Sequence, residues 1–172
     1  RQFTDQTGLS SVHINFITQA ERTLLEADGY LARLGEQFHW TNRNYQSFDD
    51  FLAALTSRKR KTIRQERRKA TEQGIRIENI TGRDLKEHHW DSFWVFYQDT
   101  GLRKWGTPYL TREAFSLLGE RMADDLLLTL AFTETGTDPI AGALHFIGGD
   151  TLYGRYWGCT EQAKFLHFEC CY

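Results

Sequence analysis

Three apolar runs follow one another near the end of the chain with only short turns between them. They are Leu126–Thr133, Pro139–Ile147 and Thr151–Cys159, and each has the length and composition of a β-strand. The triplet Gly148-Gly149-Asp150 between the last two is typical of a tight hairpin turn. Strands joined by such short turns pair as antiparallel neighbours. The sequence therefore predicts an antiparallel sheet in this part of the chain.

Helical patterns surround these strands. Ile75–Ile80 is expected to be a further strand, and Arg83–Thr100 a helix that carries a one-sided aromatic stripe, which we interpret as core. A second helix is expected at about Thr111–Ala123, and Phe165–Tyr172 resembles the opening of another. The stripe consists of Trp90, Phe93, Trp94 and Tyr97. Helices set among consecutive antiparallel strands predict an α+β fold.

The first part of the chain shows weaker patterns. Ser11–Ile17 and Tyr30–Trp40 are rich in strand-forming residues, so both are expected to be strands. Between them, Thr18 followed by Glu21 forms the capping-box pattern that begins a helix, which should run to Ala27.

A strongly basic block lies in the middle of a chain whose net charge is only −2. An amphipathic helix beginning after Ser47 precedes it, and the helical pattern runs on to Gly74 with a break expected near Thr56. Eight of the twelve residues from Arg58 to Lys69 are Arg or Lys. Two interpretations stay open: a solvated linker helix, or a helix that binds phosphates through Lys61, Arg64, Arg67 and Arg68.

Composition and motifs restrict the class of protein. Three cysteines, Cys159, Cys170 and Cys171, form no disulfide framework, so we expect reduced thiols and a cytoplasmic protein. Their spacing with His167 fits no common zinc pattern, and no metal site is expected. No apolar run reaches the roughly 20 residues of a membrane span. The chain has neither a nucleophile elbow nor a Walker loop.

The last predicted strand carries the strongest candidates for ligand binding. Strand alternation puts Tyr153, Arg155 and Trp157 on one face and Tyr156 on the other. An arginine held between aromatic rings can bind a carboxylate or phosphate through two hydrogen bonds. The alternative is a structural arginine paired with a nearby acid. Further candidates are Lys104 and Trp105 in the loop between two helices, and His39 and Trp40 in the first part of the chain.

Several segments together resemble the FemAB-like family, the peptidoglycan biosynthesis or recognition proteins of the GNAT acyltransferase superfamily. They are QFHWTN (37–42), FDDFLAALTSRKRKTIRQERRKA (48–70), RKWGTPYLT (103–111), AGAL (141–144), LYGRYWGC (152–159) and LHFE (166–169). The resemblance implies a Fem-type pair of GNAT-like domains, of which this chain is expected to be a fragment spanning the junction. Residues 1–46 would end a first domain, residues 47–74 would form the connecting helix, and residues 75–172 would begin a second domain.

The same resemblance implies an acyltransferase that passes an aminoacyl or other acyl group to an amine, within cell-wall peptide metabolism. It places His167 and Glu169 beside the acyl cleft, where either could take the proton of the attacking amine. The alternative is that neither is catalytic: one of the two caps the helix and the other is a solvated side chain. No cofactor is expected to be bound permanently. The oligomeric state stays open.

One departure bears on the acyl donor. Acetyl-CoA-using GNAT proteins have a glycine-rich turn after this strand, whereas Thr160–Glu169 contains no glycine. The resemblance therefore favours aminoacyl-tRNA over acetyl-CoA as donor, and a tRNA or another phosphate-bearing ligand as partner. A different class of function stays open beside it, namely a non-catalytic module that binds RNA or another anionic polymer through the basic helix.

Overall fold

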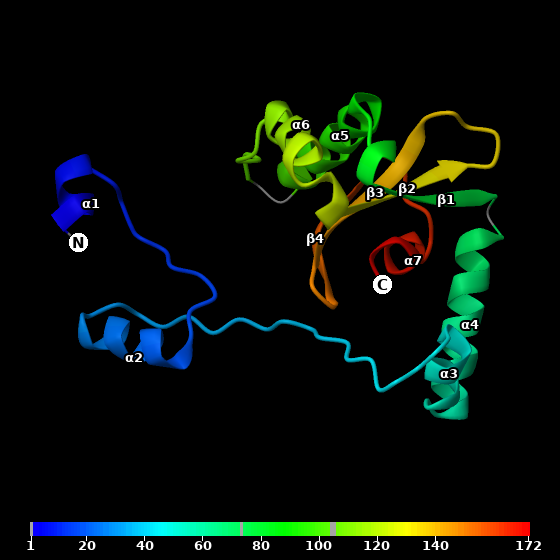
Figure 1. Cartoon of the computed structure of the whole chain (residues 1–172), viewed down its shortest axis with the longest axis horizontal. Coiled ribbons are helices and arrows are strands. Elements are labelled where there is room, and N and C mark those ends of the chain that lie inside the picture. The colour runs from blue at the N-terminus through cyan, green and yellow to red at the C-terminus, as the bar shows by residue number, and fades with distance from the viewer. Residues whose placement is uncertain (1, 73, 104–105) are drawn as a thin grey trace. The chain divides into compact units, whose positions relative to one another are not determined.

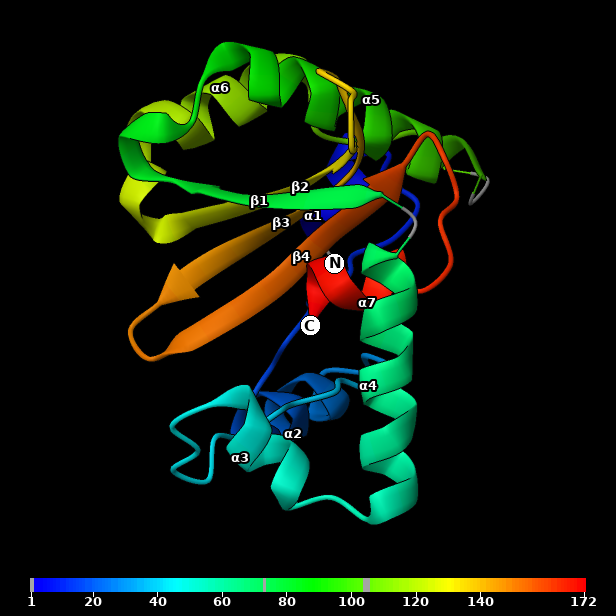
Figure 2. The same cartoon turned by 90° about the vertical axis from the view of Figure 1, so that its right-hand side faces the viewer.

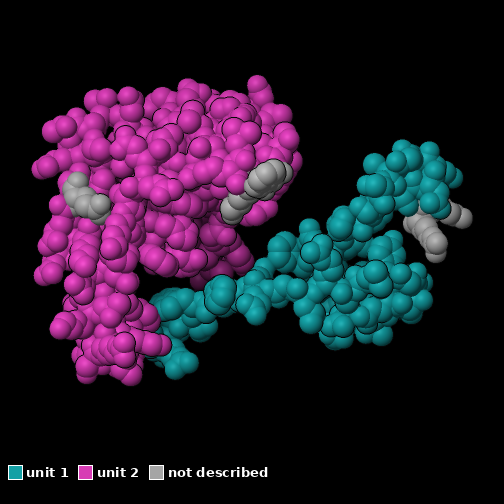
Figure 3. Space-filling model, turned by 180° about the vertical axis from the view of Figure 1, so that it is seen from behind, with its two compact units in different colours: residues 1–45 teal, residues 46–172 magenta. Residues whose placement is uncertain are grey.

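The computed structural model describes residues 2–72, 74–103 and 106–172. The chain divides into two units, residues 1–45 and residues 46–172, and each is described by itself (Figure 3). In the first unit, helix α1 spans Gln2–Thr7 and helix α2 spans Gln19–Ala27. The predicted capping box begins α2: the Glu21 N–H donates to Thr18 Oγ1 over 3.3 Å, and the Thr18 N–H donates to Glu21 Oε2 over 2.7 Å.

The two strands expected in the first unit are wrong. Ser11–Ile17 and Tyr30–Trp40 contain no strand in the structure, which describes both segments completely. Apolar alternation makes a β-strand only when a second strand satisfies the N–H and C=O groups. Leu31, Leu34 and Phe38 are almost fully exposed.

The second unit is built on a four-stranded antiparallel sheet in the order β1-β2-β3-β4, as far as the described residues show (Figure 1). Its strands are β1 (Ile75–Thr81), β2 (Leu126–Thr133), β3 (Pro139–Gly148) and β4 (Thr151–Cys159). Strands that are neighbours in the sheet also follow one another along the chain. The expected α+β architecture and its antiparallel strands are therefore present.

Helices cover the two faces of this sheet (Figure 2). On one face lie the 3-10 turn η1 (Gly82–Asp84), helix α5 (Glu87–Arg103), helix α6 (Arg112–Arg121) and the turn η2 (Ala123–Asp125). Helix α7 (Leu166–Cys171) lies on the other face. Because both faces are covered, β2 is buried along most of its length.

The main core lies between α5, α6 and the sheet. Phe115 of α6 is fully buried, and its ring lies within 6.1 Å of four aromatic rings of α5, measured between centroids. Those four are Trp90, Phe93, Trp94 and Tyr97, so the predicted core stripe is confirmed. A second core joins α7 to the opposite face through Ala143, Leu166 and Cys170.

Helix α5 lies so close to β4 that only glycine fits at one position. A Cβ built on Gly158 would lie 2.3 Å from the backbone oxygen of Phe96. The Thr100 hydroxyl donates to the carbonyl of Trp157 over 3.1 Å and fixes the two elements beside each other. The wall between α5 and β4 is therefore formed by backbone against backbone.

Helices α3 (Phe48–Ala53) and α4 (Ser57–Thr71) precede the sheet. The predicted break falls where expected, because Thr56 is the N-cap of α4 and its hydroxyl accepts from the Lys59 N–H over 3.5 Å. After α4, Gly74 has a φ of +68°, a conformation that glycine adopts without strain and that directs the chain into β1.

A buried histidine makes this unit sensitive to acid. His145 of β3 is 3% exposed, and its Nδ1 lies 3.4 Å from the carbonyl oxygen of Leu127. Burial lowers the pKa of His145, although backbone hydrogen bonds to Leu127 and Cys171 oppose the shift. Below about pH 6.5, the unfolded chain binds a proton that the folded chain resists, so the free energy of unfolding falls.

We expect wild type to lose up to about 1.4 kcal/mol of stability per pH unit through His145 as the pH falls below 6.5. Urea unfolding at pH 7.5 and 5.5 measures this loss. The variant His145→Gln should lose clearly less between the two pH values, whatever its stability at pH 7.5. Burial also lowers the pKa of His89, so part of the dependence should persist. An unchanged loss in His145→Gln would contradict the assignment.

Candidate functional site

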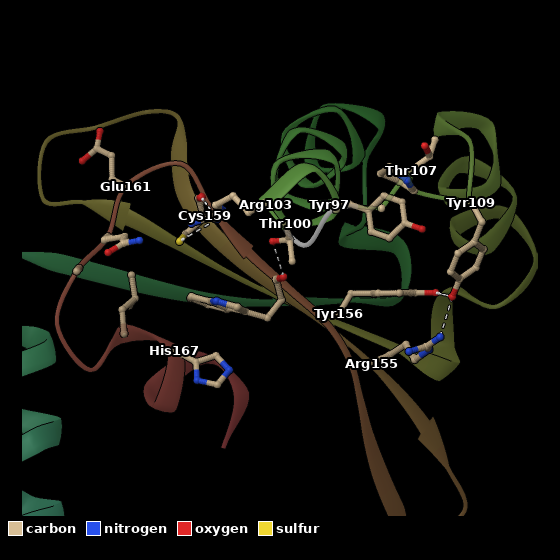
Figure 4. A pocket seen from close by; sticks show the side chains of 17 residues that line it. Tyr97, Thr100, Arg103, Thr107, Tyr109, Arg155, Tyr156, Cys159, Glu161 and His167 are labelled. Carbon is tan, nitrogen blue, oxygen red and sulfur yellow. Dashed lines mark hydrogen bonds between the residues drawn. The ribbon is translucent and has the colours of Figure 1, made fainter. Parts of the chain in front are cut away.

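An open cleft of about 830 Å³ lies where β4, the end of α5, the loop before α6 and the beginning of α7 meet (Figure 4). Both cores end at this cleft, because β4 contributes to each of them. It is lined by Tyr97, Thr100, Gly101, Arg103, Gly106, Thr107, Pro108, Tyr109, Arg155, Tyr156, Trp157, Cys159, Glu161, Gln162, Ala163, Leu166 and His167.

The substrate-binding candidates of β4 are divided between this cleft and its surroundings. Arg155, Tyr156 and Trp157 line the cleft. Tyr153 is exposed, lies outside the lining residues and sits towards the hairpin, where its ring is 3.0 Å from the Cβ position of Gly148. The cleft therefore uses the second half of the strand.

The predicted alternation of side chains along β4 is wrong at Arg155. Tyr156 pairs with Leu144 and Gly154 pairs with His145, so the register shifts and Arg155 is the additional residue of a β-bulge. A bulge turns one side chain out of the regular alternation. As a result Arg155 and Tyr156, expected on opposite faces, both reach Tyr109 (Figure 4).

These three side chains form one hydrogen-bonded group, which we call the arginine–tyrosine cluster. Arg155 Nη2 donates to the Tyr109 hydroxyl over 2.7 Å, and the hydroxyls of Tyr109 and Tyr156 share a hydrogen bond of 2.6 Å. The Arg155 guanidinium also stacks 4.5 Å from the centre of the Tyr156 ring. Burial, with the Tyr109 hydrogen bond second, raises the pKa of Tyr156. Tyr156 is therefore a neutral hydrogen-bonding group.

His167 of α7 lines the cleft beside Trp157 of β4. Its ring is exposed and meets the Trp157 ring edge-on, with 5.1 Å between the ring centres. Helix α7 brings it there, and α7 begins after Phe165, whose φ of 67° is unusual for a bulky residue. The imidazole thus borders the same space as the arginine–tyrosine cluster.

Glu169 is engaged elsewhere. Its carboxylate accepts two hydrogen bonds from Arg67 of α4, with Nη2 to Oε1 at 2.8 Å and Nε to Oε2 at 3.1 Å. Arg67 also stacks on Phe48 of α3, with its Cζ 4.3 Å from the ring centre. Glu169 does not line the cleft and joins α7 to α4.

The other anion-binding candidates, Lys61, Arg64 and Arg68, share one face of α4. With Ser57, Arg60 and Gln65 they line a shallow groove of about 560 Å³. Arg64 pairs with Asp49 over 3.0 Å and Arg68 with Glu72 over 3.1 Å, but these side chains are more than half exposed. Exposed ion pairs contribute little stability, so both arginines can exchange their partners for a ligand.

The remaining candidates are not among the described lining residues of the cleft. Lys104 and Trp105 are outside the described residues. His39 and Trp40 belong to the first unit, where His39 Nε2 lies 3.3 Å from Gln37 Oε1 and the Trp40 ring lies 6.2 Å from the Tyr45 ring. Their proposed role at a groove between domains stays a prediction.

Sequence reasoning missed several residues of the cleft. Tyr109 is not among the residues predicted from the sequence, although an aromatic residue beside a proline in a polar loop is a usable signal. Arg103 Nη2 donates to the carbonyl of Cys159 over 3.1 Å, and its partner lies 56 residues away. The Tyr97 hydroxyl accepts from the Leu110 N–H over 3.2 Å and holds the loop before α6.

The thiols and metal ligands add little to the site. Burial raises the pKa of Cys170 and of Cys171 to about 12, so both are protonated thiols at neutral pH. No group of three His, Cys, Asp or Glu side chains within residues 2–72, 74–103 and 106–172 could hold a metal ion. The helices of the same ranges include none long and apolar enough to cross a membrane.

Comparison with known proteins adds one finding. The family model of FemAB-like proteins, described as peptidoglycan biosynthesis/recognition, matches residues 1–172. No curated protein matches the chain.

Proposed function

The chain belongs to the FemAB-like family, and from that premise we propose that it is an acyltransferase that transfers an aminoacyl or other acyl group to an amine in peptidoglycan peptide metabolism. The observation that carries the proposal is the cleft, which brings His167 and the cationic Arg155 to one solvent-accessible space. Its described lining combines the aromatic rings of Tyr97, Tyr109, Tyr156 and Trp157 with polar side chains, and such a mixture can orient a small ligand.

The chemistry is direct aminolysis. The amine nitrogen attacks the carbonyl carbon of an acyl ester, the new C–N bond forms, and the ester C–O bond breaks to release an alcohol. The amine must lose one proton, which His167 accepts and passes to the leaving oxygen. We assign this role to His167 rather than Glu169, since His167 lines the cleft and Glu169 is bound by Arg67.

We further propose that residues 75–172 are the opening part of a GNAT-like domain, that residues 47–74 form the connecting helix, and that residues 1–46 end a preceding domain. The boundary between the two units, at residues 45 and 46, agrees with this division. The turn from β4 to α7 has no glycine, and such a turn favours aminoacyl-tRNA over acetyl-CoA as donor.

The test is an acyl-transfer assay on the full-length protein, with a panel of aminoacyl-tRNAs and CoA thioesters and an amine acceptor. Transfer from an aminoacyl-tRNA supports the proposal. Transfer from a CoA thioester would support acyl transfer to an amine but would contradict aminoacyl-tRNA as the donor. Binding of tRNA without acyl transfer from any donor would contradict the proposal that the protein is an acyltransferase.

Aminolysis by this route needs no protein nucleophile, so Cys159 should be dispensable although it lines the cleft. We expect Cys159→Ser to keep the transfer rate within about threefold of wild type, because serine preserves the size of the side chain. Single-turnover rates measure this. A loss of a hundredfold or more would indicate an acyl-cysteine intermediate instead.

The groove on α4 supports a second candidate function, that of a non-catalytic module binding RNA or another anionic polymer. Four cations line this groove, namely Arg60, Lys61, Arg64 and Arg68. A row of cations on one helix face follows a phosphate backbone and binds it with a strong dependence on salt.

We expect the pair Lys61→Gln and Arg64→Gln to weaken RNA binding and to reduce the slope of log K against log salt by about 1.4, for two lost phosphate contacts on a single strand. The matched control is Arg58→Gln with Lys59→Gln, which removes the same charge from exposed positions outside the groove. Equal slopes in the two double variants would show that RNA binding depends on net charge and not on the groove.

A further inference from the structure

The acyl acceptor, we propose, carries a carboxylate, and the arginine–tyrosine cluster of Arg155, Tyr109 and Tyr156 binds it. The acceptor part rests on the proposed function, whereas carboxylate binding rests on the geometry of the cluster alone. Tyr109 enters as a positioning residue that holds the guanidinium.

The guanidinium is fixed on three sides before any ligand arrives. The bulge directs Arg155 out of the strand, the Tyr156 ring supports its flat face at 4.5 Å, and the Tyr109 hydroxyl accepts one of its N–H groups at 2.7 Å. Because these contacts hold its plane, less side-chain entropy is lost when a ligand binds.

Arg155 lacks the acidic partner that a structural arginine would have. No carboxylate of the described residues lies within 4.0 Å of its guanidinium, whereas Arg64, Arg67, Arg103 and Arg112 each pair with one. The described residues therefore give no support to the interpretation of Arg155 as one half of an internal ion pair.

A count of protons shows what the cluster can bind. One N–H of Arg155 is used on Tyr109, and one phenolic proton is used between the two hydroxyls. Whichever phenol donates in that pair, one phenolic O–H and further guanidinium N–H groups stay available. The cluster thus offers donors from a cation and a neutral phenol, which is the arrangement that a carboxylate requires.

The charge of the cleft favours a carboxylate over a phosphate. Among the described lining residues, two besides Arg155 are fully charged: Arg103, which pairs with Asp99, and Glu161, which is exposed. A single unpaired guanidinium balances a monoanion, whereas a phosphate dianion needs a second cation. The groove on α4 supplies such a group of cations, so the two anion sites differ in kind.

The far end of the cleft fits the amine of the same ligand. Glu161 and Arg155 lie on opposite sides of the cleft in Figure 4, and His167 lies below the strand that runs between them. A ligand whose amine and carboxylate are well separated matches these two charges, and a peptide or the side-chain amine of lysine offers such a separation. The geometry therefore adds a carboxylate to the proposed amine acceptor, at a distance from the amine.

The test uses Nα-acetyl-lysine and its carboxamide, two amines that differ only in the carboxylate. NMR titration of wild type should show the acid bound about tenfold more tightly than the amide, since a hydrogen bond to a charged group contributes about 1.5–3 kcal/mol. Arg155→Gln should abolish that selectivity, and Tyr109→Phe, which removes only the hydroxyl, should reduce it to about threefold. Arg121→Gln, an exposed arginine outside the cleft, should keep it.

The outcomes separate the two proposals. Selectivity for the acid that is lost in Arg155→Gln supports the carboxylate site even if no acyl transfer is ever observed. Equal binding of acid and amide, or binding of neither, overturns the site even if transfer is observed. Tighter binding of inorganic phosphate than of the acid, with the phosphate lost in Arg155→Gln, overturns the choice of carboxylate.

Discussion

Replacing His167 with Asn is expected to lower the rate of acyl transfer by about 10²- to 10⁴-fold, the usual contribution of a positioned general base. Asparagine keeps a polar side chain of similar reach but accepts no proton at neutral pH. Because the ring is exposed at the edge of the cleft, the substitution should leave the fold intact. The rate of single-turnover transfer, measured beside the affinity for the donor, gives the result.

Glu169→Gln is the discriminating control. Its carboxylate accepts from Arg67 outside the cleft, so its loss should act through the position of α7 and cost much less than the loss of His167. A double-mutant cycle with Arg67→Gln separates the roles, since two residues that act as one pair show strong coupling. If Glu169→Gln alone stops the reaction while Arg67→Gln and His167→Asn do not, the base is Glu169.

Gly158→Ala is expected to destabilise the second unit by about 3 kcal/mol, the upper end of the cost of overpacking. The new Cβ would lie 2.3 Å from the backbone oxygen of Phe96 and 2.7 Å from its carbonyl carbon. Neither atom can move unless α5 moves as a whole. Urea unfolding followed by circular dichroism measures the loss.

Gly154→Ala on the same strand is the matched control. Its Cβ would meet its nearest neighbour, His145 Cδ2, at 3.7 Å, an ordinary contact, so its free energy of unfolding should stay within about 1 kcal/mol of wild type. Similar losses in the two variants would show that glycine matters for the strand itself. A loss of stability confined to Gly158→Ala would show that its cause is the close contact between α5 and β4.

The sequence predicts the second unit well because its signals are local. Hairpin glycines, caps such as Ser47 and Thr56, and the stripe from Trp90 to Tyr97 each act within a few residues. The strands expected at Ser11–Ile17 and Tyr30–Trp40 fail for the opposite reason. A strand exists only with a partner, and apolar alternation does not say whether one is present.

The site is less predictable because its contacts are distant in sequence. Arg155 was identified from its aromatic neighbours, but the bulge that re-aims it depends on how β3 pairs with β4. Its partner Tyr109 is 46 residues away. In the basic helix, Arg67 looks like its neighbours Arg64 and Arg68, yet Glu169, 102 residues later, binds it. All three arginines have a carboxylate partner, but only the partner of Arg67 belongs to α7, and no local pattern distinguishes that arginine.

The order of the strands has a consequence for hydrogen exchange. Amides of β2 lie in the middle of the sheet with both faces covered, so they should exchange only when the unit unfolds globally. In the described sheet β4 pairs with β3 alone, and half of its amides point away from that partner. These amides should exchange with solvent at a much lower free energy of opening. Within the described sheet, these amides of β4 should therefore exchange before those of β2.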